Sequence, residues 1–261
     1  MQQENGFRPE ASGFGGLGRR AFLGLVGAGV AGAVGMPGAE AAQRKRKHTL
    51  SYPYLDRAAW GADETRRFDA NGVEKFPPAY YPLQTLTVHH TALKSGIDHN
   101  ATDPAAIMRN LYQNMTGGDA SQNYGDFGYH YLIDEAGAVY EGRYSGDDGK
   151  PAVDATGQVV TAAHIAGWNS GNLGIVVLGN FNNWAPTTAA VESLTELLAC
   201  IARPHQLDPH GTTNFVNPVS GATKTIPTIS GHGDWVITDC PGTNLRSQFP
   251  AIRDGVAALL A

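Results

Sequence analysis

Apolar and polar residues alternate between Gln84 and His90, a pattern that predicts a β-strand with two different faces. One face carries Leu86, Val88 and His90, and the other carries Thr85, Thr87 and His89. His89 is therefore expected among the polar residues, whereas His90 is expected on the apolar side. We interpret His89 as the histidine that acts as a ligand and His90 as a residue that packs in the interior or supports the ligand residues.

The rest of the chain alternates between strand-like and helix-like segments. A strand hairpin is expected over 129–134 and 139–141, and the continuous apolar run 173–178 is typical of a strand buried on both faces. Helices are expected from Pro104, capped by Asp103, to about Met115, over 187–202, capped by Thr187 or Thr188, and over 245–260. Polar segments at 63–82, 117–128, 145–160 and 208–227 are expected to be loops. This order predicts an α/β fold with a central mixed β-sheet flanked by helices.

Residues 1–41 are predicted to be an export signal rather than part of the fold. Arg19 and Arg20, followed by Phe22 and Leu23, form a twin-arginine signature. The apolar stretch 23–36 is short and glycine-rich for a membrane span, and 39–41 offers a small-residue cleavage site. The alternatives are an uncleaved anchor or a chance arginine pair. We expect twin-arginine export of the folded protein to the cell wall or the medium, with no stable membrane anchor after cleavage.

Residues 42–54 are predicted to be a basic linker and 55–261 a single domain. The linker contains Arg44–Lys47, which could touch an anionic wall or membrane surface, although a solvated linker is the simpler interpretation. The chain of 261 residues has a formal net charge of -5, with 42% hydrophobic and 16% charged residues. This composition is ordinary for a globular protein and gives no support for a nucleic-acid partner. We expect a monomer.

Two histidines and one cysteine suggest a metal site. His89 lies near the end of the predicted strand, His232 lies in a Ser-Gly-His-Gly-Asp segment, and Cys240 follows eight residues later in a turn. Neutral imidazole and thiolate are ligands that zinc favours, and three protein ligands leave a fourth position for water. Such a zinc is a Lewis acid, which indicates a hydrolase. The alternative is a disulfide between Cys240 and Cys200, but Cys200 lies in a helix-like run and the spacing favours metal binding by Cys240.

Seven motifs in order along residues 55–255 resemble the type 2 zinc N-acetylmuramoyl-L-alanine amidases, a family that includes peptidoglycan recognition proteins and phage amidase-lysozymes. The motifs are Arg57–Gly61, Val88–Ala92, Gly128–Ile133 with Val139–Arg143, His164–Asn169, Leu173–Asn180, Ser230–Asp234 and Thr238–Gly242. Each motif alone is weak, and the ordered set is specific. The resemblance implies one zinc ion, in a cleft on one side of the sheet, held by His89, His232 and Cys240.

The resemblance also implies an activity: hydrolysis of the amide bond between N-acetylmuramic acid and L-alanine in peptidoglycan. Tyr129 matches the active-site tyrosine, which would hydrogen-bond the attacking water or the developing oxyanion. Some bacterial relatives carry a catalytic glutamate where this chain has Val176, and phage members carry a lysine where it has Thr238. These two departures place the chain on the tyrosine-dependent branch.

The other residues of the motifs are assigned roles beside the metal ligands. Thr238 can only orient water or substrate through its hydroxyl. His164, Trp168 and Asn169 are assigned to substrate binding, His164 through the glycan or the oxyanion and the other two as a saccharide or peptide wall. Ordinary packing is the alternative for Tyr129, and a satisfied loop histidine is the alternative for His164. His130 shares a predicted strand face with Leu132, so we expect it to be buried.

Two rival functions remain at the level of sequence. One is a non-catalytic peptidoglycan-binding module on the same scaffold, but such members typically replace the cysteine ligand, and Cys240 is present. The other is a zinc peptidase or another amide hydrolase with the same metal chemistry and a different substrate.

Overall fold

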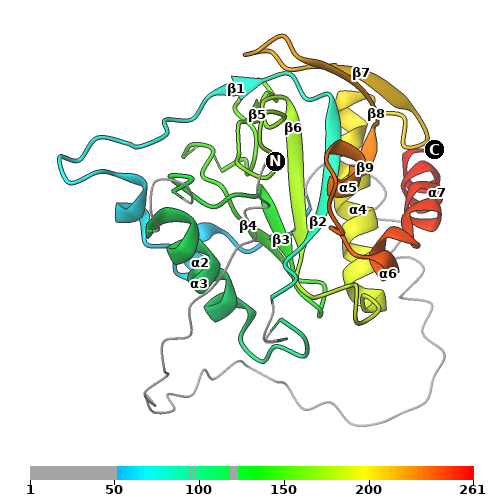
Figure 1. Cartoon of the computed structure of the whole chain (residues 1–261), viewed down its shortest axis with the longest axis horizontal. Coiled ribbons are helices and arrows are strands. Elements are labelled where there is room, and N and C mark those ends of the chain that lie inside the picture. Colours follow the sequence, from blue (N-terminus) through cyan, green and yellow to red (C-terminus); the bar gives the residue numbers. More distant parts are fainter. Residues whose placement is uncertain (1–51, 94–95, 97, 118–122, 148) are drawn as a thin grey trace, which may run out of the picture. The chain divides into compact units, whose positions relative to one another are not determined.

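A five-stranded sheet forms the centre of the fold, with strand order β4-β3-β6-β2-β9 (Figure 1). The computed structural model describes residues 52–261 apart from 94–95, 97, 118–122 and 148, all within one compact unit, Leu50–Ala261. The strands are β2 (Thr85–His90), β3 (Tyr131–Ile133), β4 (Val139–Glu141), β6 (Asn172–Val177) and β9 (Ile229–Gly231). β4 runs antiparallel to β3, whereas the other neighbours are parallel. The mixed sheet predicted from the sequence is confirmed. The predicted export signal and most of the linker lie outside the described residues.

Helices lie on both sides of this sheet (Figure 1). α4 (Thr188–His205) and α7 (Phe249–Leu260) pack together on one side. On the other side lie α3 (Pro104–Gly117), the short α2 (Arg57–Trp60) and the 3₁₀ turn η1 (Glu64–Arg67). Two further short helices, α5 (His232–Trp235) and α6 (Thr243–Arg246), follow β9. Within the described residues, no helix is both long and apolar enough to span a membrane.

The two faces of β2 differ in character, as the alternation predicts. All six residues of β2 are buried, but Leu86 and Val88 join the apolar core that α4 and α7 complete. On the opposite face, Thr87 donates its hydroxyl to Asn172 Oδ1 at 2.8 Å and contacts Ser230 Oγ at 3.1 Å. Buried polar groups need such partners. The sheet therefore has a polar, hydrogen-bonded face, on which His89 lies.

The predicted starts of the first two helices are confirmed. Asp103 Oδ1 accepts the backbone N–H of Ala106 at 2.9 Å, and α3 begins at Pro104. Thr187 Oγ1 accepts the N–H of Ala190 at 3.1 Å and caps α4. α4 continues to His205, beyond the predicted end at residue 202, and passes through Pro204 in its last turn. The missing N–H of Pro204 removes only one hydrogen bond there.

The loop predicted over 208–227 is wrong, because much of it forms a hairpin. β7 (Thr212–Val216) pairs antiparallel with β8 (Thr223–Pro227). Threonines, which suggest a loop when they accompany Gly, Pro and Asn, are also β-branched residues that suit strands. Phe215 and Ile226 are the buried residues of the hairpin, and they pack with Ile165 and Trp235.

The helix predicted over 245–260 is also wrong as a single element. α6 ends at Arg246 and α7 begins at Phe249, with Pro250 in its first turn. A proline in a helix interior loses a hydrogen bond and clashes with the preceding turn, whereas the first turn tolerates it. Two predicted loops also contain short strands, β1 (Tyr80–Tyr81) and β5 (Val159–Val160), which pair with each other. η1 lies in the first of those loops.

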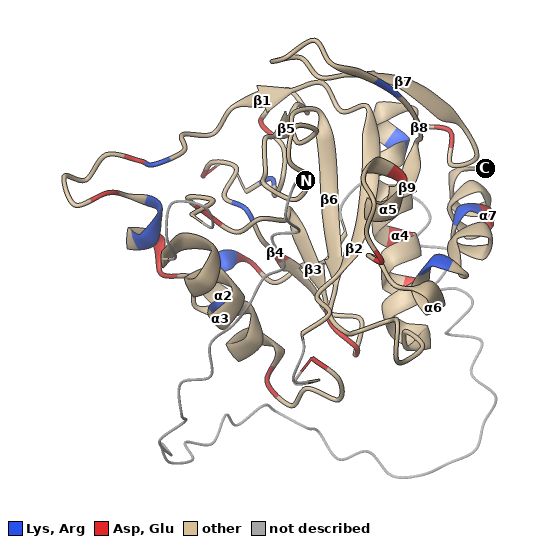
Figure 2. Ribbon diagram, viewed as in Figure 1, with Lys and Arg blue, Asp and Glu red and all other residues tan. Residues whose placement is uncertain are grey.

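Charged residues lie on helices, on loops and on two strands, as Glu141 in β4 and Lys224 in β8, whereas β2, β6 and β9 contain none (Figure 2). One of the ion pairs is buried in the interior. Arg57 Nη1 lies 3.0 Å from Asp126 Oδ1, and both side chains are almost completely buried. Arg57 also donates to the carbonyl oxygen of Gly142, and Asp126 accepts the N–H of Tyr144 at 2.8 Å. This pair joins the segment that precedes β3 to the segment that follows β4, and Tyr129 lies in the first of them.

Candidate metal centre

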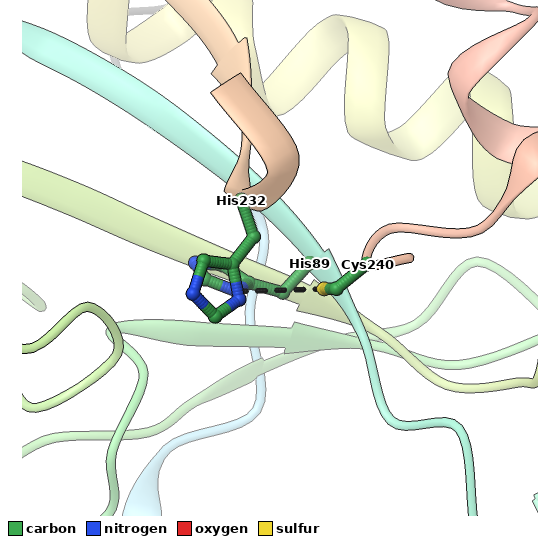
Figure 3. A group of neighbouring side chains, drawn as sticks. All are labelled: His89, His232 and Cys240. Atoms are coloured by element: carbon green, nitrogen blue, oxygen red, sulfur yellow. Dashed lines mark hydrogen bonds between the residues drawn. The ribbon is translucent and has the colours of Figure 1, made fainter. Parts of the chain in front are cut away.

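Strand register brings His89 and His232 together. β2 and β9 are parallel neighbours, and Val88 pairs with Gly231. In the chain, each of these two residues is followed by a histidine, so both side chains lie at the carboxyl end of the sheet, where open α/β sheets commonly bind ligands. The two ring centroids are 4.7 Å apart. His232 is the first residue of α5, and both rings point into one cluster with Cys240 (Figure 3).

Backbone hydrogen bonds hold Cys240 in this cluster. The N–H of Gly233 donates to the Cys240 carbonyl at 2.9 Å, and the N–H of Cys240 donates to Thr238 Oγ1 at 3.3 Å. The N–H of His90 points at Cys240 Sγ at 3.5 Å. The loop after α5 therefore folds back so that the sulfur faces the histidines.

The three ligand atoms suit a tetrahedral metal. The ligand atoms of His89, His232 and Cys240 all lie within 4.8 Å of one another, and Cys240 Sγ is 3.7 Å from His89 Nδ1. Zinc–sulfur and zinc–nitrogen bonds at the tetrahedral angle place S and N about 3.6 Å apart. His89 is buried, whereas the other two are partly exposed, which leaves one side of the cluster open. Cys200 and Cys240 do not form a disulfide in this structure.

The protonation states also suit a cation. Burial, together with His164 and His232, holds the pKa of His89 well below its ordinary value. Burial lowers the pKa of His232 to about 4, so both rings are neutral near pH 7 and can act as ligands. Burial raises the pKa of the Cys240 thiol to about 12. A thiolate in this position therefore requires a nearby positive charge, which a metal ion supplies.

Tyr129 lies beside the cluster. It precedes β3 instead of belonging to it, and its carbonyl accepts the N–H of Arg143 at 2.9 Å. Its ring contacts His89 edge to face, with centroids 5.0 Å apart. Burial, with a smaller contribution from Cys240, raises the pKa of Tyr129 above its ordinary value. The phenol is therefore protonated at neutral pH and able to donate a hydrogen bond.

His164 reaches the cluster from behind His89. Its Nδ1 lies 3.0 Å from His89 Nε2, and its Nε2 lies 3.1 Å from the carbonyl oxygen of Asn172. The side chain is buried, so both ring nitrogens are engaged within the protein. The sequence suggested His164 as a substrate-binding residue and gave no signal of its contact with His89.

Trp168 and Asn169 follow His164 in the same loop. Trp168 packs against Trp235 and Phe215, with ring centroids 5.5 Å and 6.0 Å away. Asn169 Oδ1 accepts the N–H groups of His164 at 2.9 Å and Ile165 at 2.8 Å. Both side chains remain partly exposed, so each combines a contact within the protein with a surface open to solvent.

Three further predictions concern residues around the cluster. Thr238 is exposed in the loop that carries Cys240. His130 is buried, as predicted: its Nε2 donates to the Val160 carbonyl at 2.6 Å, and its Nδ1 accepts the N–H of Gly174 at 2.9 Å. Val176 pairs with His89 across the sheet and is fully buried, so no carboxylate occupies that position.

The sequence profile of the Amidase_2 family, N-acetylmuramoyl-L-alanine amidase, matches residues 79–243. The matched segment contains the three residues of the cluster and Tyr129. The chain belongs to this family. The predicted resemblance is thereby confirmed at the level of the family.

Individual proteins also match this chain. The chain is 30% identical over 200 residues to peptidoglycan-recognition protein SC2 of Drosophila melanogaster, a match that covers 77% of this chain and 86% of that protein. It is 30% identical over 165 residues to the human N-acetylmuramoyl-L-alanine amidase, covering 63% of this chain but only 23% of that longer protein.

Solved structures show the same fold. The Drosophila peptidoglycan recognition protein SD aligns with a TM-score of 0.50 and 27% identity, covering 76% of this chain and 94% of that chain. Wild-type Drosophila PGRP-LB aligns with a TM-score of 0.53 and 20% identity, covering 77% and 94%. The fold shared with these structures therefore covers about three quarters of this chain, well beyond the metal cluster.

Proposed function

We propose that this protein is a zinc-dependent N-acetylmuramoyl-L-alanine amidase, which hydrolyses the amide bond between N-acetylmuramic acid and L-alanine in peptidoglycan. The observation that carries the proposal is the partly exposed His89–His232–Cys240 cluster within the segment that matches the amidase family. Family membership alone does not separate an amidase from a peptidoglycan-binding module. The retained cysteine favours the enzyme, because a binding module has no need of an open metal site.

The proposed chemistry assigns a task to each residue. His89, His232 and Cys240 would hold one zinc ion, which when bound would supply Lewis acidity and a hydroxide nucleophile near neutral pH. Tyr129, with its protonated phenol beside His89, would donate a hydrogen bond to the oxyanion that develops on the amide carbonyl. Thr238 would orient water or substrate through its hydroxyl. The exposed parts of Trp168 and Asn169 would form one wall for the muropeptide.

We further propose that residues 1–41 direct twin-arginine export of the folded domain, followed by the linker 42–54. Replacing Arg19 and Arg20 with lysine should block secretion while leaving cytoplasmic synthesis unchanged. Immunoblots of medium and cell fractions measure this directly. Undiminished secretion of the double variant would refute the twin-arginine route and leave the domain's activity untouched.

Digestion of purified peptidoglycan tests the proposed activity. The wild-type protein should contain one zinc per chain and should release the amino group of L-alanine, whereas His232→Ala should lose both zinc and activity. His210→Ala is the matched control, because His210 is an exposed histidine outside the cluster.

Other products of the same digestion would contradict the proposal. A new reducing sugar would indicate a glycosidase, and an internal peptide amine would indicate a peptidase. Binding to peptidoglycan without any cleavage, by a protein loaded with zinc, would indicate a recognition module.

Tyr129→Phe tests the oxyanion role. The variant keeps the ring that contacts His89 but loses the only donor of the side chain, and loss of such a donor typically reduces turnover on the order of a hundredfold. We expect zinc content and thermal stability to be unchanged. Thr238→Ala, the companion variant, should reduce turnover less. Wild-type turnover by a zinc-loaded Tyr129→Phe protein would mean that the tyrosine only packs against His89.

A further inference from the structure

A short chain of hydrogen bonds runs from the metal cluster into the sheet. His89 Nε2 lies 3.0 Å from His164 Nδ1, and His164 Nε2 lies 3.1 Å from the Asn172 carbonyl oxygen. A carbonyl oxygen can only accept a hydrogen bond. The proton of the His164 ring is therefore on Nε2, where it is donated to Asn172.

The position of this proton on His164 determines which nitrogen of the His89 ring is protonated. A neutral imidazole carries one proton, and the contact with the Asn172 carbonyl oxygen places it on Nε2. His164 Nδ1 is then an acceptor, and His89 Nε2 must donate to it. With its proton on Nε2, a neutral His89 ring carries a lone pair on Nδ1. The hydrogen-bond network assigns these protons.

The contact made by the second nitrogen of His89, Nδ1, is consistent with this assignment of protons. Its Nδ1 is the atom that faces Cys240 Sγ at 3.7 Å, where it can accept from the thiol or bind a metal. The two nitrogens of His89 therefore have separate partners. Nε2 points toward His164, and Nδ1 points toward the open side of the cluster.

The position of the His164 ring is itself tightly determined. Its backbone N–H donates to Asn169 Oδ1 at 2.9 Å, which fixes the start of the loop. The ring lies against the backbone of Gly174 on β6, where a Cβ atom would lie only 2.6 Å from His164 Cγ. Only glycine at this position allows so close an approach. The ring therefore lies in a space that the absence of a side chain at Gly174 leaves open.

We propose that His164 is a positioning residue for the metal centre: it holds His89 in the tautomer with the proton on Nε2 and presents the Nδ1 lone pair to the metal. The proposal deepens the proposed function and rests on zinc binding by the cluster. It replaces direct substrate contact as the role of His164, because both ring nitrogens already have partners. Partners of this kind orient metal-binding histidines, and their removal typically weakens metal affinity 10–100-fold.

The tautomer can be observed in the metal-free protein. The experiment records long-range ¹H–¹⁵N correlation spectra of histidine-labelled full-length protein at about pH 7.5, where neutral imidazole is the usual form. The spectra should show that His89 is protonated on Nε2 and unprotonated on Nδ1. Assignment uses the loss of one signal in His89→Gln. In His164→Leu the fixed tautomer should give way to a mixture. A His89 ring protonated on Nδ1 in the wild type would overturn the proposal.

Zinc affinity provides the second measurement, by competition with a fluorescent chelator. His164→Leu should bind zinc about 10–100-fold more weakly than the wild type. His164→Gln should retain more affinity, because its carboxamide offers one acceptor and one donor, as the neutral imidazole does. His210→Ala should match the wild type. Thermal melting of each metal-free variant confirms that it is folded.

The outcomes separate this proposal from the proposed function. Wild-type zinc affinity in folded His164→Leu would overturn the positioning role. Equal loss of zinc affinity in the Leu and Gln variants would also overturn it, because it would mean that the His164 ring acts only by packing. If the wild type itself bound no zinc, the proposed amidase chemistry would fail. The tautomer of His89 would still be decided, because the spectra are recorded without metal.

Discussion

The parallel pairing of β2 with β9 is the constraint on which the candidate centre depends. It joins segments that are 143 residues apart in the sequence, as the contact between Thr87 and Ser230 shows. Because parallel strands end at the same edge of the sheet, His89 and His232 emerge side by side. Cys240 then needs only the short turn after α5 to reach them. Weakening this pairing would separate two of the three cluster residues, even with every side chain of the cluster intact.

The polar face behind the cluster makes this arrangement rigid. Thr87 and Ser230 bind the indole N–H of Trp235, each at 3.0 Å, so the strand pair and α5 share one hydrogen-bonded network. Gly174 serves a second purpose on this face, since its N–H binds His130 while its missing side chain leaves space for His164. A site held by strands and satisfied hydrogen bonds keeps its geometry before any ligand arrives. Preorganisation of this kind is what an electrostatic role for Tyr129 requires.

Local sequence signals predicted β2, which carries His89, and two helices that flank the sheet, but not β9 or α5, which position His232. The alternation over β2 separated His89 from His90, and Asp103 and Thr187 correctly marked two helix starts. The hairpin β7–β8 was missed because threonine-rich strands share their composition with loops. The break between α6 and α7 was missed although Pro250 signals it, because the apolar period continues across the break.

Contacts that depend on tertiary structure left no local signal. The partner of His89 is His164, 75 residues away, and neither residue type nor spacing indicates that pair. The same holds for Arg57 and Asp126, whose buried ion pair supports the segment that carries Tyr129. Motif order could identify the family and the three cluster residues. Only the structure distinguishes a histidine that faces substrate from one that orients a neighbouring ring.

The central claim is an open metal site with one sulfur and two nitrogen ligands from the protein. Zinc K-edge X-ray absorption of the purified, zinc-loaded protein tests it most directly. The account predicts one sulfur at about 2.3 Å and two imidazole nitrogens at about 2.0–2.1 Å, with a light atom from solvent completing the shell. Four protein ligands, more than one sulfur, or a zinc shell without sulfur would contradict it.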